Sequence, residues 1–250
     1  AIQHSLFIKL QIIMHHSRNV ALSGTIRKSI SNGRTLVKCS CRQKIRTGFS
    51  YQVRKHIPNM KIDKRVAILL CTYNGCKFIR KQLDSITHQT HQNWVIFVSD
   101  DGSTDGTLDI IHEYQQNYGE DKIVLLHGPN KGFAWNFISA LESCGDAFDY
   151  YAFSDQDDEW VENKLSHALN YLAHNPQTPS VYCGRTILTD EEGEVIGLSP
   201  LFDKTPSFRN ALVQSIAGGN TMVLNKQARD IVIETPKWQE IISHDWWVYI

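Results

Sequence analysis

Apolar runs of strand length alternate with helical patterns along the middle of the chain. Four such runs occur, at residues 66–71, 94–98, 122–126 and 150–153. The first, Val66–Cys71, is continuously apolar, which is typical of a strand buried on both faces of a parallel sheet. Between the first two runs, Ile79, Leu83 and Ile86 fall on one face of a predicted helix. Four strands alternating with three helices predict a doubly wound α/β fold, a Rossmann-like, mostly parallel sheet with helices on both faces.

The boundaries of the later elements rest on turn and capping residues. Ser103 or Thr104 is expected to cap the second helix, and Gly119 to end it before the strand at 122–126. After the fourth strand, a helix is expected within 160–173. Beyond it the pattern loosens: 180–189 and 194–198 predict a hairpin, and 220–224 a further strand. The C-terminal part is therefore expected to be a mixed region joined to the parallel sheet.

Residues 1–62 show neither a helical nor a strand period, and their charge differs from that of the rest. Residues 1–65 hold 14 of the 26 Lys and Arg but one of the 26 Asp and Glu, so this part carries +13 and the remainder −13. Three interpretations stay open: an organelle transit peptide, a basic arm that contacts anionic lipid or nucleic acid, or an extension without function. We expect 1–62 to be disordered or outside the fold, and 63–250 to form one domain.

The composition is that of an ordinary soluble protein. Of the 250 residues, 42% are hydrophobic and 21% charged, close to the averages of globular proteins. The six cysteines form no C-x-x-C pair and no zinc spacing, which favours a reducing compartment over a disulfide framework. No apolar run approaches the roughly 20 residues that span a bilayer. Because the chain begins with Ala1 and ends at Ile250 without a polar tail, it is expected to be a fragment.

Polar residues whose side chains could bind a ligand or take part in catalysis follow the predicted strands. They are Thr72, Tyr73 and Asn74 after the first, Asp100 and Asp101 after the second, and Asp155, Asp157 and Asp158 after the fourth. No glycine-rich dinucleotide or P-loop motif follows the first strand, which disfavours those two classes. Three aspartates within four positions repel one another, so a divalent cation such as Mg²⁺ or Mn²⁺ is predicted there. The alternative is a solvated acidic turn that caps the following helix.

Six segments resemble, in order and spacing, the family 2 glycosyltransferases of the GT-A fold. They are VAILLCTYNG (66–75), FVSDDGSTD (97–105), GPNKGFAWN (128–136), FSDQDDEW (153–160), AGGN (217–220) and HDWW (244–247). The resemblance covers about residues 65–250. A single motif of this kind is weak evidence for a family, but six motifs in the same order and spacing are specific evidence. The D-Q-D-D-x-W and H-D-W-W forms look most like a bacterial rhamnosyltransferase branch that uses dTDP-rhamnose or a related nucleotide sugar.

The resemblance implies roles for individual residues. Those matching nucleotide-sugar-binding positions are Thr72, Tyr73, Asn74, Asp100, Asp101, Gly132, Asn136 and Asp155. Those matching the metal-binding element are Asp155, Asp157 and Asp158, with Asp157 expected to ligate Mg²⁺ or Mn²⁺ directly. Asp245 matches the catalytic base of inverting members. The neighbouring Trp246 and Trp247 either stack on a sugar or lie half in the core, and we favour the second interpretation.

The resemblance also implies partners and a location. The expected donor is a dTDP- or UDP-sugar, and the acceptor a saccharide or lipid-linked saccharide of cell-envelope polysaccharide biosynthesis. No nucleic acid is expected to bind. The expected location is the cytoplasm, with peripheral association at the inner face of the cell membrane left open.

Two other functions remain open from the sequence. A catalytically inactive GT-A-like module that binds nucleotide or glycan would fit a truncated acceptor side. A sugar-nucleotide pyrophosphorylase would share the sheet and the metal chemistry, but it normally has a glycine-rich basic loop after the first strand, which Cys71–Gly75 lacks.

Overall fold

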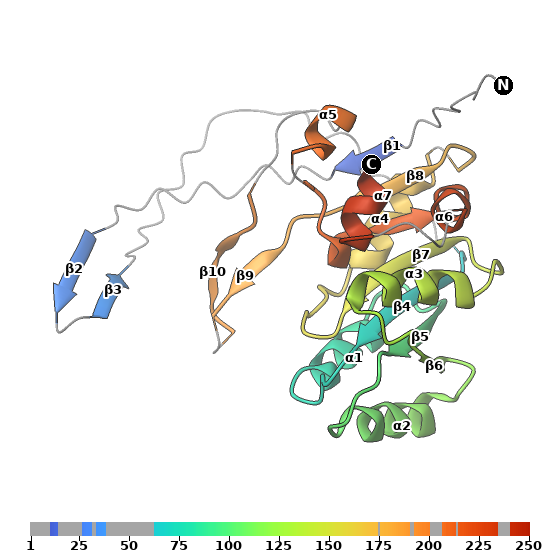
Figure 1. Ribbon diagram of the computed structural model, residues 1–250, viewed down its shortest axis with the longest axis horizontal. Coiled ribbons are helices and arrows are strands. Elements are labelled where there is room, and N and C mark those ends of the chain that lie inside the picture. The colour runs from blue at the N-terminus through green and yellow to red at the C-terminus, as the bar shows by residue number, and fades with distance from the viewer. Residues whose placement is uncertain are drawn as a thin grey trace. The chain divides into compact units, whose positions relative to one another are not determined.

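The computed structural model describes residues 63–250, apart from 175, 191–192, 201–206, 214 and 235–240, and three short strands at 11–14, 27–31 and 34–38. A seven-stranded sheet forms the centre of the domain, in the order β1-β8-β11-β7-β4-β5-β6 (Figure 1). Its strands are β1 (Gln11–Met14), β4 (Val66–Thr72), β5 (Trp94–Asp100), β6 (Ile123–His127), β7 (Tyr150–Asp155), β8 (Ser180–Cys183) and β11 (Val223–Asn225). Strands β4 to β7 are mutually parallel, whereas β11 runs antiparallel to β7 and β8.

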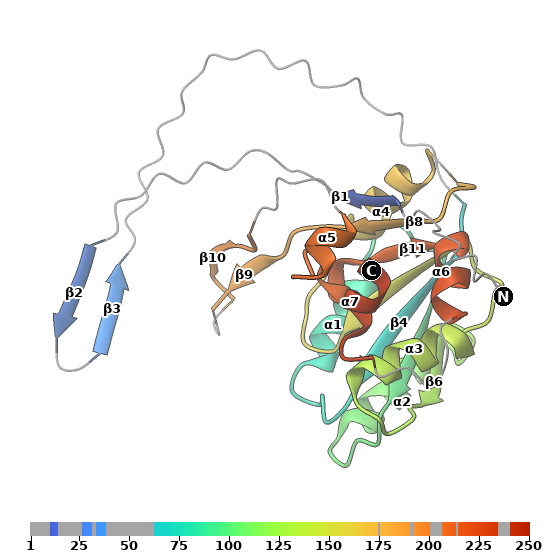
Figure 2. The same ribbon diagram turned by 45° about the horizontal axis from the view of Figure 1, so that its top comes forward.

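Helices cover both faces of the sheet, which confirms the doubly wound α/β prediction (Figure 2). One layer contains α1 (Ile79–Thr87), α2 (Thr107–Tyr118) and α4 (Lys164–Leu172); the other contains α3 (Phe133–Ser143), α6 (Lys226–Ile233) and α7 (His244–Tyr249). Alternate residues of β4 point to opposite layers: Leu69 packs in the core under α3, and Ile68 in the core under α1. The strand is apolar from Val66 to Cys71 because both of its faces are buried.

Two predicted boundaries are displaced. Helix α2 begins at Thr107, not after Ser103 or Thr104, because the Asp105 carboxylate accepts hydrogen bonds from the backbone N–H (3.0 Å) and the hydroxyl of Thr107. Gly119, with φ 94°, ends this helix as expected. The strand predicted at 220–224 begins only at 223, because Gly219–Thr221 forms a 3-10 turn.

Smaller elements complete the second half. Strands β9 (Ile187–Thr189) and β10 (Val195–Leu198) form a hairpin, but the strand predicted at 180–189 is interrupted at 184–186, so Ser180–Cys183 is β8 of the main sheet and only β9 pairs with β10. Helix α5 (Phe208–Ala211) is a single helical turn. Within the described residues, no helix is long and apolar enough to cross a membrane.

The N-terminal segment contains three described strands. β1 pairs in parallel with β8, with Gln11 opposite Ser180. β2 (Arg27–Ser31) and β3 (Arg34–Lys38) form an antiparallel hairpin within a separate unit, residues 16–61. The rest of 1–62 lies outside the described residues, and its separation from the domain stays a prediction.

Candidate active site

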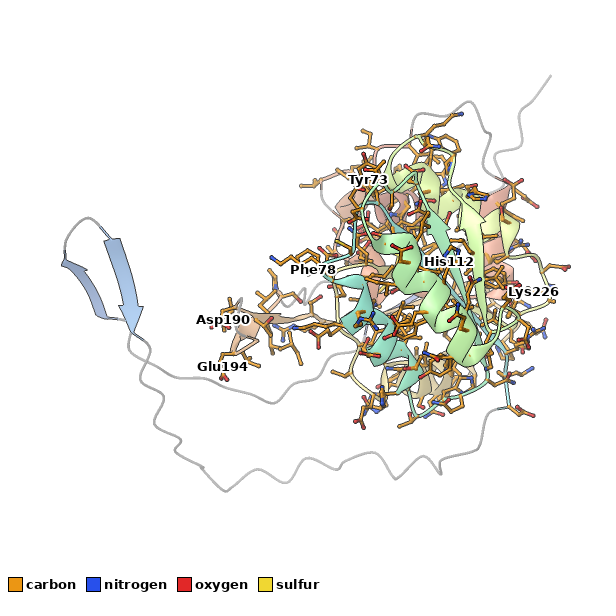
Figure 3. All side chains as sticks on the ribbon, turned by 90° about the horizontal axis from the view of Figure 1, so that it is seen from below. Tyr73, Phe78, His112, Asp190, Glu194 and Lys226 are labelled. Carbon is orange, nitrogen blue, oxygen red and sulfur yellow. The ribbon has the colours of Figure 1, made fainter. Side chains whose placement is uncertain are left out.

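A cavity of about 640 Å³ opens where the parallel strands β4, β5 and β7 end. Loops that follow parallel strands meet at one edge of a sheet, so residues distant in sequence converge there. The lining residues are Cys71, Thr72, Tyr73, Asp101, Gly102, Asn130, Gly132, Phe133, Asn136, Phe137, Asp155, Gln156 and Asp157. Tyr73 is 58% exposed, and Figure 3 shows it at this end of the domain, away from Lys226 at the start of α6.

Gln156 ties the loop after β4 to the loop after β7. Its Oε1 accepts hydrogen bonds from the Thr72 hydroxyl (2.6 Å) and the Tyr73 backbone N–H (3.0 Å), and its Nε2 donates to the Tyr73 carbonyl (3.2 Å). The sequence predictions missed this residue. Its only signal was its place between two predicted aspartates, which does not reveal a partner 84 residues earlier.

The two aspartates after β5 have different surroundings. Asp101 lines the cavity, and its carboxylate accepts hydrogen bonds from the backbone N–H groups of Asn130 (2.6 Å) and Gly132 (3.1 Å). Asp100 is buried below it, where its carboxylate accepts from the backbone N–H groups of Gly102 (3.1 Å) and Ser103 (2.9 Å). Asp101 therefore faces the cavity and shapes the loop after β6, whereas Asp100 fixes its own turn.

Asn74 lies outside the cavity lining and joins two loops. Its backbone has a φ of 48°, its N–H donates to the Ser103 hydroxyl (2.8 Å), and its Oδ1 accepts from the Thr104 N–H (2.9 Å). Asparagine tolerates this left-handed conformation better than most residues. Asn74 thus supports the position of Tyr73 and is not itself on the cavity wall.

Gly132 and Asn136 form the wall contributed by α3. Gly132 precedes the helix with a φ of 83°, a conformation that favours glycine. Asn136 is 2% exposed, and both ends of its amide bind Ser99: Oδ1 accepts from the hydroxyl (2.6 Å) and Nδ2 donates to the carbonyl (2.9 Å). Asn136 therefore fixes α3 against β5 while one side of it lines the cavity.

The acidic loop, Asp155–Glu159, brings carboxylates to the cavity. Asp155 and Asp157 line it, whereas Asp158 accepts a hydrogen bond from the Asn220 Nδ2 (2.6 Å). Burial, followed by the charges of Asp158, Asp157 and Asp245, raises the pKa of Asp155 to about 7. Burial also raises the pKa of Asp158, against the opposing effect of Asn220. The loop thus concentrates negative charge that is costly without a compensating cation.

The donor set of the cavity fits a divalent cation only in part. Among the described residues, no three His, Cys, Asp or Glu side chains gather closely enough to hold a metal ion. Mg²⁺ commonly takes one or two protein carboxylates and completes its shell with water and phosphate oxygens. Asp155 and Asp157, which both face the cavity, suit such a site. A site that also includes Asp158 stays a prediction.

Lys164 lies beneath the acidic loop and was not predicted. Its ammonium group donates a hydrogen bond to the Asn220 carbonyl and lies 4.2 Å from the centre of the Trp160 ring. Burial lowers the pKa of Lys164 to about 8, while the charges of Asp158 and Asp155 act in the opposite direction. It forms no direct ion pair with a carboxylate of the described residues.

Asp245, the predicted base, lies in the first turn of α7, outside the cavity lining. Its Oδ1 accepts hydrogen bonds from the Trp246 backbone N–H (2.7 Å) and the Ser243 hydroxyl. After burial and the charges of Asp158 and Asp157, the charge of Asp245 also contributes to the raised pKa of Asp155.

His244, beside the predicted base, is buried between aromatic rings. Its ring stacks on Phe137 with 3.9 Å between centres and meets Phe153 edge-on at 5.1 Å. Neither ring nitrogen has a hydrogen-bond partner in the described structure. Burial lowers the pKa of His244 to about 4, against the charge of Asp245.

The two tryptophans of α7 hold the helix in place. The Trp246 indole N–H donates to the Ala211 carbonyl, which ties α7 to α5. Trp247 is half-buried against the core under α3. Both contacts agree with the interpretation that these residues lie half in the core.

A family model described as Glycosyl transferase family 2 matches residues 67–228. Among curated relatives, the dTDP-rhamnosyl transferase RfbG of Shigella flexneri is 33% identical over 193 residues, which cover 72% of this chain and 63% of RfbG. The putative teichuronic acid biosynthesis glycosyltransferase TuaG of Bacillus subtilis is 27% identical over 162 residues, covering 65% of this chain and 62% of TuaG. The chain thus spans less than two thirds of the length of either relative.

Solved structures of S. aureus TarS 1–349 are similar in fold. One has a TM-score of 0.54 at 20% sequence identity, covering 74% of this chain and 55% of TarS 1–349. The complex of the same protein with UDP-GlcNAc has a TM-score of 0.56 at 19% identity, covering 74% of this chain and 52% of that chain.

Proposed function

The chain belongs to glycosyl transferase family 2 and has the GT-A fold, and we propose that it transfers a sugar from a nucleoside-diphosphate donor to a saccharide acceptor with inversion at the anomeric carbon. The observation that carries this proposal is the cavity at the carboxyl edge of the sheet. Its volume of about 640 Å³ lies in the range of small-molecule sites. Thr72, Tyr73 and Asp101 lie on its wall together with the carboxylates of Asp155 and Asp157.

We assign the donor to residues of the cavity wall. Thr72, Tyr73 and Asp101 hold the nucleobase, Asp155 contacts the ribose, and Gly132 and Asn136 shape the wall opposite. Asn74 and Asp100 act indirectly, because their hydrogen bonds fix the loops that carry Tyr73 and Asp101. Mg²⁺ or Mn²⁺ bound by Asp155 and Asp157 would supply positive charge for the diphosphate.

Asp245 acts as the general base in this proposal. It takes the proton from an acceptor hydroxyl while that oxygen attacks the anomeric carbon from the face opposite the nucleotide. The bond from the anomeric carbon to the diphosphate oxygen breaks in the same step, so the configuration inverts. Within the described residues, both hydrogen bonds to Asp245 end on Oδ1, and we therefore assign the acceptor proton to Oδ2.

The finer identity of donor and acceptor follows from the relatives. RfbG is a dTDP-rhamnosyl transferase, which supports dTDP-rhamnose as the first donor to test, and the TarS complex supports a UDP-sugar as the second. TuaG, named for teichuronic acid biosynthesis, supports a saccharide or lipid-linked saccharide of the cell envelope as the acceptor. A cytoplasmic enzyme at the inner face of the membrane would meet both substrates.

The test is a donor panel with the full-length protein. We expect one of dTDP-rhamnose, UDP-GlcNAc or UDP-glucose to release nucleoside diphosphate with Mn²⁺ present, and the product to have the inverted anomeric configuration by NMR. Asp245→Asn should lower kcat by at least about 10²-fold, whereas Asp109→Asn, on the exposed side of α2, should not. A product with retained configuration refutes inversion. Binding without any turnover indicates an inactive module, and release of pyrophosphate from a nucleoside triphosphate and a sugar phosphate indicates a pyrophosphorylase.

A further inference from the structure

The AGGN segment, for which the site so far has no role, lies between the acidic loop and α7. Its residues form a tight turn, Gly218–Thr221, in which the Gly218 carbonyl accepts from the backbone N–H (3.0 Å) and hydroxyl (2.8 Å) of Thr221. The next residue, Met222, accepts a hydrogen bond from the Phe153 N–H of β7 (3.2 Å). The turn is therefore fixed to the strand that leads into the acidic loop.

On one side, Asn220 connects the turn to the acidic loop. Its Nδ2 donates to the Asp158 carboxylate (2.6 Å), and its carbonyl accepts from the buried ammonium group of Lys164. Lys164 in turn packs over Trp160, which follows the acidic loop directly. Asn220 thus binds both the Asp158 carboxylate of the acidic loop and the Lys164 ammonium group.

On the other side, Gly219 contacts the start of α7. A Cβ added to Gly219 would lie 2.3 Å from the His244 Nε2 and 3.3 Å from the Asp245 Cβ, so only glycine allows this approach. The His244 ring has little room to move, because it is stacked on Phe137. The backbone of the turn therefore sets the position of the first turn of α7.

We propose that the Gly218–Thr221 turn is a clamp that holds the acidic loop in register with Asp245, with Asn220 and Lys164 as positioning residues. The proposal rests on the function proposed above, which gives the acidic loop to the donor and Asp245 to the acceptor proton. A base that shifts by about 1 Å relative to the reacting carbon can cost up to about 10²-fold in rate. Among the described residues, the hydrogen bonds of Thr72, Tyr73 and Asp101 at the nucleobase end that involve a side chain go to Gln156 and to the loop after β6, not to the turn, so donor binding should change little.

The first test displaces the base side of the clamp. Gly219→Ala should lower kcat by at least about 10-fold, with the donor KM changed by less than about threefold. Gly197→Ala is the matched control, because a Cβ there meets nothing within 4 Å. Equal kcat for Gly219→Ala and Gly197→Ala would overturn the proposal. If Gly219→Ala fails to fold, the loop-side variants decide.

The second test removes the loop side. Asn220→Ala and Lys164→Met should each lower kcat with little change in donor KM. Asn220→Ala removes the bond to the Asp158 carboxylate, whereas Lys164→Met removes the bond to the Asn220 carbonyl, which alanine keeps. The controls are Asn163→Ala, whose exposed side chain lies just before α4, and Lys64→Met, whose ammonium pairs on the surface with Asp149, outside the acidic loop, at 2.8 Å. A KM effect without a kcat effect would assign these residues to donor binding and overturn the clamp.

A readout without turnover separates this proposal from the proposed function. In Asn220→Ala, hydrogen exchange should accelerate at the backbone amides of both Gln156–Asn163 and His244–Tyr249, and in Asn163→Ala it should not accelerate in His244–Tyr249. If the wild type transfers no sugar but Asn220→Ala shows this joint acceleration, the proposed function fails and the coupling stands. Acceleration confined to the turn overturns the clamp whatever the activity.

Discussion

Replacing Gln156 with alanine should loosen the cavity at its nucleobase end and destabilise the domain. The change removes all three hydrogen bonds between this side chain and the loop after β4. Their partners differ in exposure: Thr72 is 2% exposed, whereas Tyr73 is 58% exposed. The Tyr73 backbone groups can therefore bind water after the change, but the Thr72 hydroxyl loses its acceptor in a buried place.

The expected magnitude follows from that difference. A buried polar group left without a partner costs about 1–3 kcal/mol, and the two exposed bonds add little. We therefore expect the free energy of unfolding to fall by about 1–3 kcal/mol, which for a domain of this size lowers Tm by about 2–4 °C per kcal/mol. Because Tyr73 is then less constrained, the Kd for a nucleoside diphosphate should rise by about 10-fold, equivalent to about 1.4 kcal/mol.

Urea unfolding and calorimetric titration with dTDP or UDP measure the two effects separately. Gln116→Ala, on the exposed side of α2, is the control for loss of a glutamine side chain. The unfolding free energy of Gln156→Glu should lie between those of Gln156→Ala and the wild type, because a carboxylate accepts from Thr72 and the Tyr73 N–H but cannot donate to the Tyr73 carbonyl. An unfolding free energy for Gln156→Ala within about 0.5 kcal/mol of wild type would refute the reasoning, since surface changes usually stay within that range.

Four further predictions concern the base, the metal, pH and the N-terminal segment. Asp245→Asn should lower kcat by at least about 10²-fold in steady-state assays with nucleotide affinity nearly unchanged; loss of affinity instead would show that Asp245 binds the donor. EDTA should abolish transfer and weaken nucleotide binding, Mg²⁺ or Mn²⁺ should restore both, and Asp157→Asn should mimic EDTA; full activity in excess EDTA would exclude the metal. Because His244 has a pKa of about 4 when folded and 6.5 as a free group, the unfolded chain takes up the proton first as pH falls. As pH falls from about 6.5 to 4, the wild type should therefore lose stability relative to His244→Gln in urea unfolding. Asp155, whose pKa burial raises to about 7, acts in the opposite direction in both proteins, so the two are compared at each pH. Equal pH dependence of the two proteins would contradict the role of His244. Deletion of 1–62 should change Tm by less than the few degrees equivalent to about 1 kcal/mol; a larger drop would show that the pairing of β1 with β8 stabilises the domain.

The sequence predicted those features that repeat along the chain. The apolar run Val66–Cys71 predicted β4 because burial on both faces of a strand requires apolar residues throughout the run. Strand β5 was predicted for the same reason. The start of α2 was misplaced because the hydrogen bonds from Thr107 to Asp105 leave no trace in the hydrophobic period. Side-chain hydrogen bonds to the backbone compete with helical hydrogen bonds, and the geometry of a single turn decides which of them form.

The site was predictable where residues follow strands and unpredictable where partners are distant. Thr72, Asp101 and Asp155 could be placed at one edge because parallel strands end together. Gln156 and Lys164 were missed because their partners lie 84 and 56 positions away and obey no period. Their roles depend on which loop reaches across the sheet, which only the folded arrangement specifies.

Strand β7 occupies the middle of the sheet but is made late in synthesis. By the time a ribosome has released β6, strands β4 and β5 can already pair, yet the second edge of β4 still lacks β7, whose Tyr150 pairs with Val66. That open edge belongs to a strand that is apolar from Val66 to Cys71, the kind that recruits strands from other chains. The other edge of β7 stays unpaired until β11 is synthesised, which happens only after β8. Chaperone binding and co-translational aggregation should therefore concentrate between the emergence of β4 and that of β7, and a charged residue placed in β7 should prolong that interval.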